Sequence, residues 1–252
     1  MAWRKKYDGA EPQRINKWLA QQGVCSRREA EALIAEGLVH IEGARVEEPG
    51  RKIAPGETIE ILDGGAAPAF SAVLNKPAGY VSAQPERDQV PAARLLTPAN
   101  LVGPGQAPSK HASLAPLGRL DRDSRGLLLL SDDGVLAKAA IGPQSKLSKQ
   151  YEVRVAGAVD ARKLSLLRHG LSLDGRALKP AEVTQTGPDM LRFVLNEGRN
   201  RQIRRMCEAV ELDVVDLLRT RIGPLQLEGL PEGRWRVLLP AERAALVAAS
   251  RD

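Results

Sequence analysis

Residues 118–130, GRLDRDSRGLLLL, combine the features that matter most for the fold and for chemistry. Within its polar half, two aspartates alternate with three arginines: Asp121, Asp123, Arg119, Arg122 and Arg125. The apolar run LLLLSDDG follows directly and ends in turn residues, which is typical of a strand buried on both faces. We therefore expect the charged turn to lead into a buried strand.

The carboxylate of Asp121 is the first candidate for catalysis. Opposite charges within a few ångströms favour the ionised form of a carboxyl group, so we expect it to be anionic at neutral pH beside the neighbouring arginines. An anionic carboxylate can act as a nucleophile or as a general base. The same residues also fit an ordinary charged turn whose aspartates bond their own backbone. The pattern alone leaves both interpretations open.

A second cationic segment, EGRNRQIRRMC at residues 197–207, contains four arginines with no acid between them. Apolar residues at positions 203, 206, 207 and 210 have the spacing of a helix with one buried face. Arg201, Arg204 and Arg205 project from the other faces, where a guanidinium fork can bind a phosphate or a carboxylate. A solvated helix face is the alternative, and by itself the segment favours neither.

Tyr151 lies in QYEVRVAG, a segment that we predict to be a strand. A tyrosine in a strand usually fills a core. The chain has only eight aromatic residues, however, and a nucleobase swung out of its helix needs a flat apolar surface to stack on. Tyr151 is therefore also a candidate for a stacking contact.

The chain divides into a small leading unit and a larger second unit. Residues 14–43, RINKWLAQQGVCSRREAEALIAEGLVHIEG, indicate two helices followed by a hairpin. GGAAPA at residues 64–69 is small and flexible enough to be a linker, and residues 98–116 are rich in breakers and indicate a long surface loop. We predict domains at residues 13–63 and 70–242, in an α+β fold; the first dozen residues have no assigned role.

Composition narrows the possible classes of protein. A net charge of +6 over 252 residues permits a polyanionic partner without requiring one. Cys25 and Cys207 stand alone, the three histidines lack ligand spacing, and phosphate-binding glycine motifs are missing, so neither a metal nor a cofactor is implied. No apolar run approaches the ~20 residues of a membrane span, and no signal peptide is evident. We expect a cytoplasmic monomer that does not contact the membrane.

Residues 13–240 resemble the RsuA-type pseudouridine synthases, the bacterial family that modifies ribosomal RNA. The resemblance is carried by GRLDRDSRGLLLL, by NKPAGYVS, KQYEVRV and EGRNRQIRRMC in the expected order, and by a leading unit similar to the RNA-binding domain named after ribosomal protein S-four. The DRDS variant followed by NRQIRRMC is most similar to the large-subunit enzymes, especially the F-type. Similarity to the small-subunit enzymes or to the B-type enzymes is left open by these motifs.

The resemblance implies a second domain with a mixed, mainly antiparallel sheet flanked by helices. It also implies that a uridine is isomerised in rRNA, with 23S rRNA or a large-subunit assembly intermediate as the first substrate and tRNA as another. Asp121 would be the catalytic aspartate, Tyr151 would stack against the target uracil, and Arg204 would pair with Asp121. No cofactor is implied.

We expect RNA contacts from basic side chains near Asp121, in the second cationic segment and in the leading unit. These are Arg119, Arg122, Arg201, Arg205, Lys76, Arg14, Lys17, Arg27 and Arg28. The leading unit is not basic overall, because residues 1–63 contain ten Lys and Arg against eleven Asp and Glu. Its RNA affinity must therefore be local.

Two other classes of protein compete with this hypothesis. A non-catalytic, ribosome-associated RNA-binding factor would explain the charge and the leading unit, but not the acid, tyrosine and basic helix that follow. A glycosidase-like enzyme pairing Asp121 with Asp123 is disfavoured, because carbohydrate clefts are lined with aromatic residues and these make up 3% of the chain.

Overall fold

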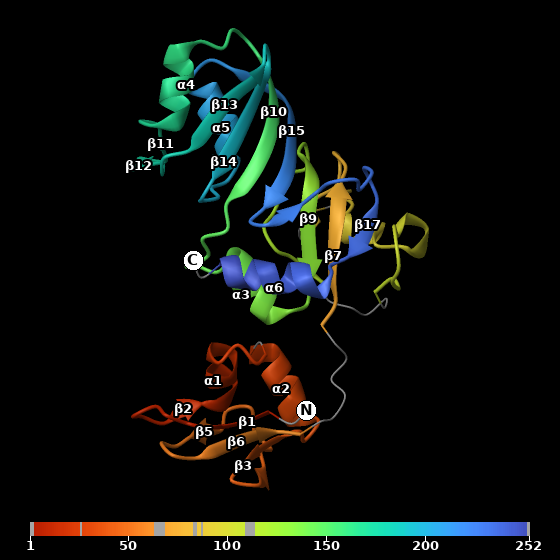
Figure 1. Ribbon diagram of the computed structural model, residues 1–252, viewed down its shortest axis with the longest axis vertical. Helices are drawn as coiled ribbons and strands as arrows, with labels where there is room; N and C mark the ends of the chain where they lie inside the picture. The colour runs from red at the N-terminus through yellow and green to blue at the C-terminus, as the bar shows by residue number, and fades with distance from the viewer. Residues whose placement is uncertain are drawn as a thin grey trace. The chain divides into compact units, whose positions relative to one another are not determined.

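The computed structural model describes residues 3–25, 27–62, 69–82, 85–86, 88–108 and 114–250 of the chain. Two compact units are present, residues 1–70 with 132–138 and residues 71–131 with 139–252 (Figure 1). Each has its own cluster of buried hydrophobic side chains. Most of the predicted linker, residues 64–68, lies outside the described residues.

The first unit contains the two predicted helices, and the predicted hairpin is part of a larger, four-stranded antiparallel sheet. Its elements are α1 (Ile15–Gln21), α2 (Arg27–Ala35), a sheet in the order β1 (Trp3–Lys6), β6 (Thr58–Ile61), β3 (Val39–Ile41), β4 (Ala44–Arg45), and the pair β2 (Gln13–Arg14) with β5 (Lys52–Ile53). The helical spacing of Ile15, Trp18 and Leu19 explains α1, because all three side chains are buried in the core. Gly37, at φ 77°, takes the left-handed conformation that commonly ends a helix such as α2.

The leading residues, for which the sequence indicates no role, form the edge strand β1. It pairs with β6 in antiparallel register, beginning with Trp3 opposite Ile61. The rings of Trp3 and Tyr7 both stand edge-on to the buried ring of Trp18, with centroids 5.6 Å apart in each pair. Such aromatic pairs contribute roughly 0.5–1.5 kcal/mol beyond the burial of their area. The extension is therefore part of the structure of the first unit.

The second unit is built on a nine-stranded mixed sheet. Seven strands lie in the order β13 (Glu182–Gly187), β14 (Met190–Leu195), β10 (Lys149–Ala156), β15 (Asp213–Ile222), β9 (Arg125–Ser131), β7 (Ser71–Lys76), β17 (Trp235–Val237), with β16 (Leu225–Gln226) beside β15 and β8 (Ala115–Pro116) beside β9. β15 and β9 run parallel, and every other pair among the described strands of this sheet is antiparallel. The mixed, mainly antiparallel sheet is confirmed.

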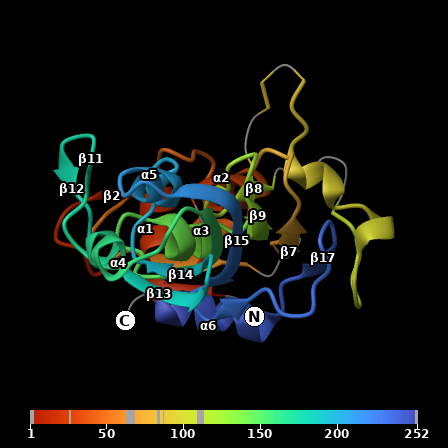
Figure 2. The same cartoon turned by 90° about the horizontal axis from the view of Figure 1, so that it is seen from above.

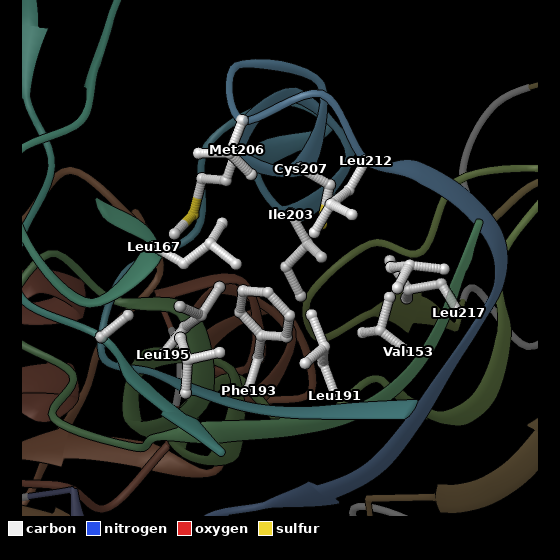
Figure 3. Close-up of a cluster of buried hydrophobic side chains, with 14 residues drawn as sticks. Val153, Leu167, Leu191, Phe193, Leu195, Ile203, Met206, Cys207, Leu212 and Leu217 are labelled. Carbon is white, nitrogen blue, oxygen red and sulfur yellow. The ribbon is translucent and has the colours of Figure 1, made fainter. Parts of the chain in front are cut away.

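Helices and a short hairpin complete the second unit. They are α4 (Ala161–Arg168), the hairpin of β11 (Ser172–Leu173) with β12 (Arg176–Ala177), α5 (Gln202–Glu208) and α6 (Pro240–Ala249), while α3 (Gly134–Ile141) crosses the division between the units. Figure 3 shows Ile203, Met206 and Cys207 of α5 in one cluster with Leu191 and Phe193 of β14. All five side chains are buried, so the predicted apolar face of the second cationic segment is confirmed.

The strand β9 lies inside the sheet between β7 and β15. The side chains of residues 127–130 are all 0% exposed, as predicted for a strand covered on both faces. The charged turn comes directly before β9. Because the turn that carries Asp121 leads directly into this buried strand, the C-terminal end of the turn is fixed in the sheet.

The predicted surface loop, residues 98–116, contains short regular elements at both ends. Before it and at its start lie the 3₁₀ turns η1 (Ala92–Leu95) and η2 (Pro98–Asn100), and β8 lies at its end. Figures 1 and 2 show the segment around η1 and η2 beside β17, where Nε1 of Trp235 donates to the carbonyl oxygen of Thr97 at 2.8 Å. Residues 101–108 are exposed or half-buried, and residues 109–113 lie outside the described residues.

Candidate active site

The turn that carries Asp121 is anchored on both sides of this residue. Before it, the hydroxyl of Ser82 donates to the carbonyl oxygen of Leu120 at 2.7 Å and accepts from its amide at 2.9 Å. After it, the amide of Ser124 donates to the carbonyl oxygen of Asp121 at 3.1 Å. The side chain of Asp121 is 33% exposed. Its backbone is thus held in place while its carboxylate stays accessible.

Arg201 brings the second cationic segment to this turn. It precedes α5 with a left-handed φ of 47°, a conformation that is uncommon for a residue other than glycine. Its guanidinium group donates to both carboxylate oxygens of Asp123 at 3.2 and 3.0 Å, and Nη1 lies 3.7 Å from Oδ2 of Asp121. One arginine therefore lies between the two aspartates of the turn.

Arg204 does not occupy the place that the resemblance implies. Its Nη2 donates to the carbonyl oxygen of Asp123 at 2.9 Å, its Nη1 donates to that of Val214 at 3.2 Å, and its Nε lies 3.3 Å from the carboxylate of Asp123. Because these contacts hold the guanidinium group on the Asp123 side, the predicted pairing of Arg204 with Asp121 is wrong. Among the described residues, it is Arg201 that lies within ion-pair distance of Asp121.

The pKa of Asp123 lies below its ordinary value. Partial burial by itself raises this pKa, but the hydrogen bond from Arg201 and the positive charges of Arg204 and Arg201 outweigh that effect. Asp123 is therefore ionised at neutral pH, and it balances some of the positive charge that two arginines bring close to Asp121.

Lys76, predicted as an RNA contact, is buried instead. Its side chain is 0% exposed, and Nζ donates to the carbonyl oxygens of Pro77 at 2.9 Å and Tyr80 at 2.8 Å. An ammonium group enclosed in this way cannot reach a phosphate, so this prediction is wrong. Burial lowers the pKa of Lys76 to about 8, although the negative charges of Asp123 and Asp121 oppose the change.

Asp121, Tyr151 and Arg204 line one open cavity of about 70 Å³ in the second unit. Leu195 and Leu217 add apolar walls. The side chain of Tyr151 is half-buried and also packs against the core cluster of this unit. Both interpretations of Tyr151 therefore hold together, because the side chain supports the core and also borders the cavity beside the carboxylate.

The predicted RNA contacts of the second unit lie at or near this cavity. Arg119 and Arg201 line it. Arg122 is exposed on the same turn, and Arg205 on α5 is partly exposed and pairs with Asp174 through bonds of 3.0 and 2.7 Å. Arg119 and Arg201 thus bring positive charge to the cavity that Asp121 lines, while Nε of Arg122 donates to the carbonyl oxygen of Gly79 at 3.2 Å.

The predicted RNA contacts of the first unit lie on or beside its two helices. The side chains of Arg14, Lys17 and Arg27 are exposed. The side chain of Arg28 lies outside the described residues. The three described side chains are accessible to a phosphate backbone.

Two arginines have roles that the sequence did not indicate. Arg125, one of the charges beside Asp121 in the sequence, binds the carboxylate of Asp216 on β15 through bonds of 2.8 and 2.6 Å. Arg219, also on β15, is buried and donates to backbone carbonyls around the charged turn. The sequence carries only a weak signal for Arg219, because DLLRTRIG contains Asp216 and Arg221 as well and so does not single out one charged residue.

Metal-binding and membrane-spanning features do not occur among the described residues. There, no three His, Cys, Asp or Glu side chains gather closely enough to hold a metal ion. Nor does any helix described there have the length and apolarity needed to cross a membrane.

The family described as RNA pseudouridylate synthase matches residues 71–209, more than half of the chain, and the S4 domain matches residues 13–59. The chain therefore belongs to the RNA pseudouridylate synthase family and is an enzyme, an isomerase. The alternative of a non-catalytic RNA-binding factor is excluded.

Relatives and a solved structure agree with this assignment. The chain is 33% identical to the dual-specificity RNA pseudouridine synthase RluF of Escherichia coli strain K12, covering 91% of this chain and 76% of that protein. It is 34% identical to the ribosomal large subunit pseudouridine synthase B of Bacillus subtilis strain 168, covering 91% and 93%. A crystal structure of a pseudouridylate synthase superposes with a TM-score of 0.65 at 28% identity, covering 92% of this chain and 99% of that one.

Proposed function

We propose that this enzyme isomerises one specific uridine of ribosomal RNA to pseudouridine, and that its substrate is the 23S rRNA of the large subunit. The name of the Bacillus subtilis relative supports the large subunit as substrate. The DRDS and NRQIRRMC sequences, which resemble the large-subunit branch, support it as well. The protein acts in the cytoplasm as a monomer.

The reaction breaks the bond between N1 of uracil and C1′ of ribose, turns the base, and joins C5 to C1′. No atoms are gained or lost. The target nucleotide must first leave its stack, which costs a few kcal/mol that contacts to the RNA backbone offset. Arg119, Arg122 and Arg201 supply such contacts around the cavity, because their guanidinium groups suit phosphate oxygens.

Asp121 is the reacting carboxylate in this proposal. It attacks C1′ or C6 of the target nucleotide, or removes the proton at C2′, and Tyr151 stacks on the uracil. Arg201 orients the carboxylate of Asp121 from 3.7 Å. Arg204 acts one step away, by fixing Asp123, which in turn binds Arg201.

The observation that carries the proposal is the cavity itself. It puts an accessible carboxylate, a half-buried aromatic side chain and arginines into one open space, and these groups come from a turn, a strand and a helix far apart in the sequence. An ordinary charged turn has no need of an aromatic side chain and apolar walls beside it.

The test is Asp121→Asn, which keeps the size of the side chain and removes its charge. We expect no pseudouridine, detected by chemical labelling and mass spectrometry of rRNA after incubation, with RNA affinity largely unchanged. The matched control is Asp189→Asn in the exposed turn between β13 and β14, which should be fully active. Product formation by Asp121→Asn would end the assignment, and product on tRNA rather than 23S rRNA would refute the substrate.

For the domains, we propose that residues 13–63 bind the RNA and that residues 70–242 carry the chemistry. The match of the S4 domain to residues 13–59 supports the first range, and the match of the synthase family to residues 71–209 supports the second. Arg14, Lys17, Arg27 and Arg28 are the proposed contacts of the first range.

A further inference from the structure

Arg219 is a buried arginine that binds backbone carbonyl groups. Its side chain on β15 is 1% exposed. Nε donates to the carbonyl oxygen of Leu127 at 2.7 Å, Nη1 to that of Arg119 at 3.2 Å, and Nη2 to that of Gly118 at 3.1 Å. Among the ion pairs of the described residues, none involves Arg219. Its positive charge is therefore held mainly by backbone dipoles.

The three carbonyl groups lie on both sides of Asp121. Gly118 and Arg119 precede it in the turn, and Leu127 follows it in β9. One guanidinium group thus joins the start of the turn to its exit. Because the peptide units at both ends are bonded to the same buried guanidinium group, the position of the carboxylate between them is restricted.

The backbone of Arg219 is itself fixed against this turn. β15 and β9 pair in parallel there, with Arg219 opposite Gly126. Gly126 has a φ of 106°, and a Cβ atom on it would collide with the carbonyl oxygen of Arg219. Since glycine alone permits this approach, β15 lies close enough for the side chain of Arg219 to reach the turn.

The shape of a guanidinium group explains why an arginine stands here. Its planar fork presents donors in several fixed directions, whereas an ammonium group donates from a single point. A lysine at position 219 could satisfy one end of the turn and would leave a carbonyl unpaired at the other. An unsatisfied buried polar group costs about 1–3 kcal/mol.

A second buried cation supports the turn from the other side. Lys76 binds the carbonyl groups of the segment 77–80, and in that segment the amide of Gly79 donates to the carbonyl oxygen of Arg122 at 2.7 Å. The charges of Asp121 and Arg219 both act on Lys76. The turn is therefore held between two buried cations, of which Arg219 alone donates to the turn directly.

We propose that Arg219 is a positioning residue of Asp121: by joining both ends of the turn, it holds the carboxylate in its reactive position when the target nucleotide enters the cavity. The proposal rests on the role of Asp121 given under the proposed function. Arg219 does not touch the RNA. Its loss should therefore reduce the rate of the chemical step and leave RNA affinity intact.

The test compares Arg219→Lys and Arg219→Ala with the matched control Arg236→Ala, measuring kcat and KM on rRNA. Arg236 is a partly buried arginine of β17 that binds Glu242 at 2.7 Å through each of two nitrogens, outside the cavity. A misplacement of about 1 Å can cost on the order of 100-fold in rate. We expect both variants of Arg219 to lose about this much in kcat, with KM changed less than about threefold, and the control to keep its kcat.

Chemical rescue separates a positioning role from a purely structural one. Arg219→Ala leaves a space of the size of a guanidinium ion, so guanidinium at a non-denaturing concentration should restore kcat about tenfold or more, while urea, which is uncharged, should not. Circular dichroism monitors the fold of each variant, and Arg219→Lys keeps the charge and most of the volume.

Each contrary result has a definite meaning. A kcat of Arg219→Lys close to that of the unchanged enzyme overturns the proposal. The proposal is also overturned if RNA affinity falls together with kcat and guanidinium does not rescue kcat, or if Arg219→Lys unfolds. Either result would mean that Arg219 stabilises the whole fold rather than positioning Asp121. If Asp121→Asn were active, the proposed function would fail whatever the variants of Arg219 do, so the two failures are distinguishable.

Discussion

Replacing the buried Lys76 by methionine tests whether the lowered pKa of this lysine makes the stability of the second unit depend on pH. Burial lowers the pKa of Lys76 from an ordinary 10.5 to about 8 in the folded protein. Each pKa unit corresponds to about 1.4 kcal/mol, so a pKa lowered by about 2.5 links folding to this proton by at most about 3.5 kcal/mol. Solvent screens the partly exposed carboxylates that oppose the shift, so the cost of burial dominates and we expect most of this amount, about 2–3 kcal/mol.

The sign of the pH dependence follows from the number of protons that Lys76 binds in the folded and in the unfolded state. Below pH 8 Lys76 is charged in both states, and the folded protein carries the full cost of the buried charge. Between about pH 8 and 10.5 the unfolded chain keeps the proton that the folded protein has lost, so the stability of the folded state rises with pH. Lys76→Met lacks this rise. Its stability at pH 7 also reflects the lost bonds to Pro77 and Tyr80, so the pH dependence is the cleaner observable.

The assay is urea unfolding of both proteins from pH 7 to 10.5, with a hydrogen-exchange pulse at one fixed pH and detection of peptides from β7 and β9. This reads the second unit alone. Other titrating groups are common to both proteins, and therefore the difference between the two free energies of unfolding isolates Lys76. If this difference stays constant over the whole range, Lys76 is not held at a lowered pKa and the reasoning fails.

Three further predictions concern the core, the charged turn and the first unit. Phe193→Ala removes a fully buried ring and should lower the free energy of unfolding of the second unit by about 3–5 kcal/mol in urea titration; a loss below about 1 kcal/mol would contradict the packing described. Asp123→Asn removes half-exposed ion pairs, so it should lower the free energy of unfolding by less than about 1 kcal/mol. It should nevertheless lower kcat about tenfold or more, because Arg201 and Arg204 lose the carboxylate that positions them. An unchanged kcat would refute this role of Asp123. Charge reversal to glutamate at Arg14, Lys17 and Arg27 should raise KM for rRNA about tenfold or more and leave kcat at saturating RNA unchanged, and a normal KM in 0.15 M salt would show that these side chains do not bind the RNA.

The sequence predicted features that depend on local order. The spacing of Ile203, Met206 and Cys207 defines the buried face of α5, and the apolar run at residues 127–130 defines β9. Both patterns consist of apolar residues at a regular spacing along the chain. Such a spacing predicts which side chains are buried without knowledge of distant contacts. For the same reason the motifs around Asp121 and Tyr151 pointed to residues that line one cavity.

The wrong predictions concern contacts between distant segments. A lysine before a proline suggests a polar turn, yet β7 carries Lys76 into the interior. The partner of Asp121 depends on the left-handed φ of Arg201, which no spacing rule specifies. The role of Arg219 requires β15 to pair with β9, some 90 residues away in the chain.

The edge position of β1 bears on how this protein can be shortened. The match to the S4 domain begins at residue 13, which makes that residue an obvious point for trimming. A chain trimmed there would leave the backbone groups of β6 unpaired along one side and remove the two rings that cover Trp18. Unpaired strand edges recruit further strands, so the trimmed protein would be prone to self-association and precipitation during purification.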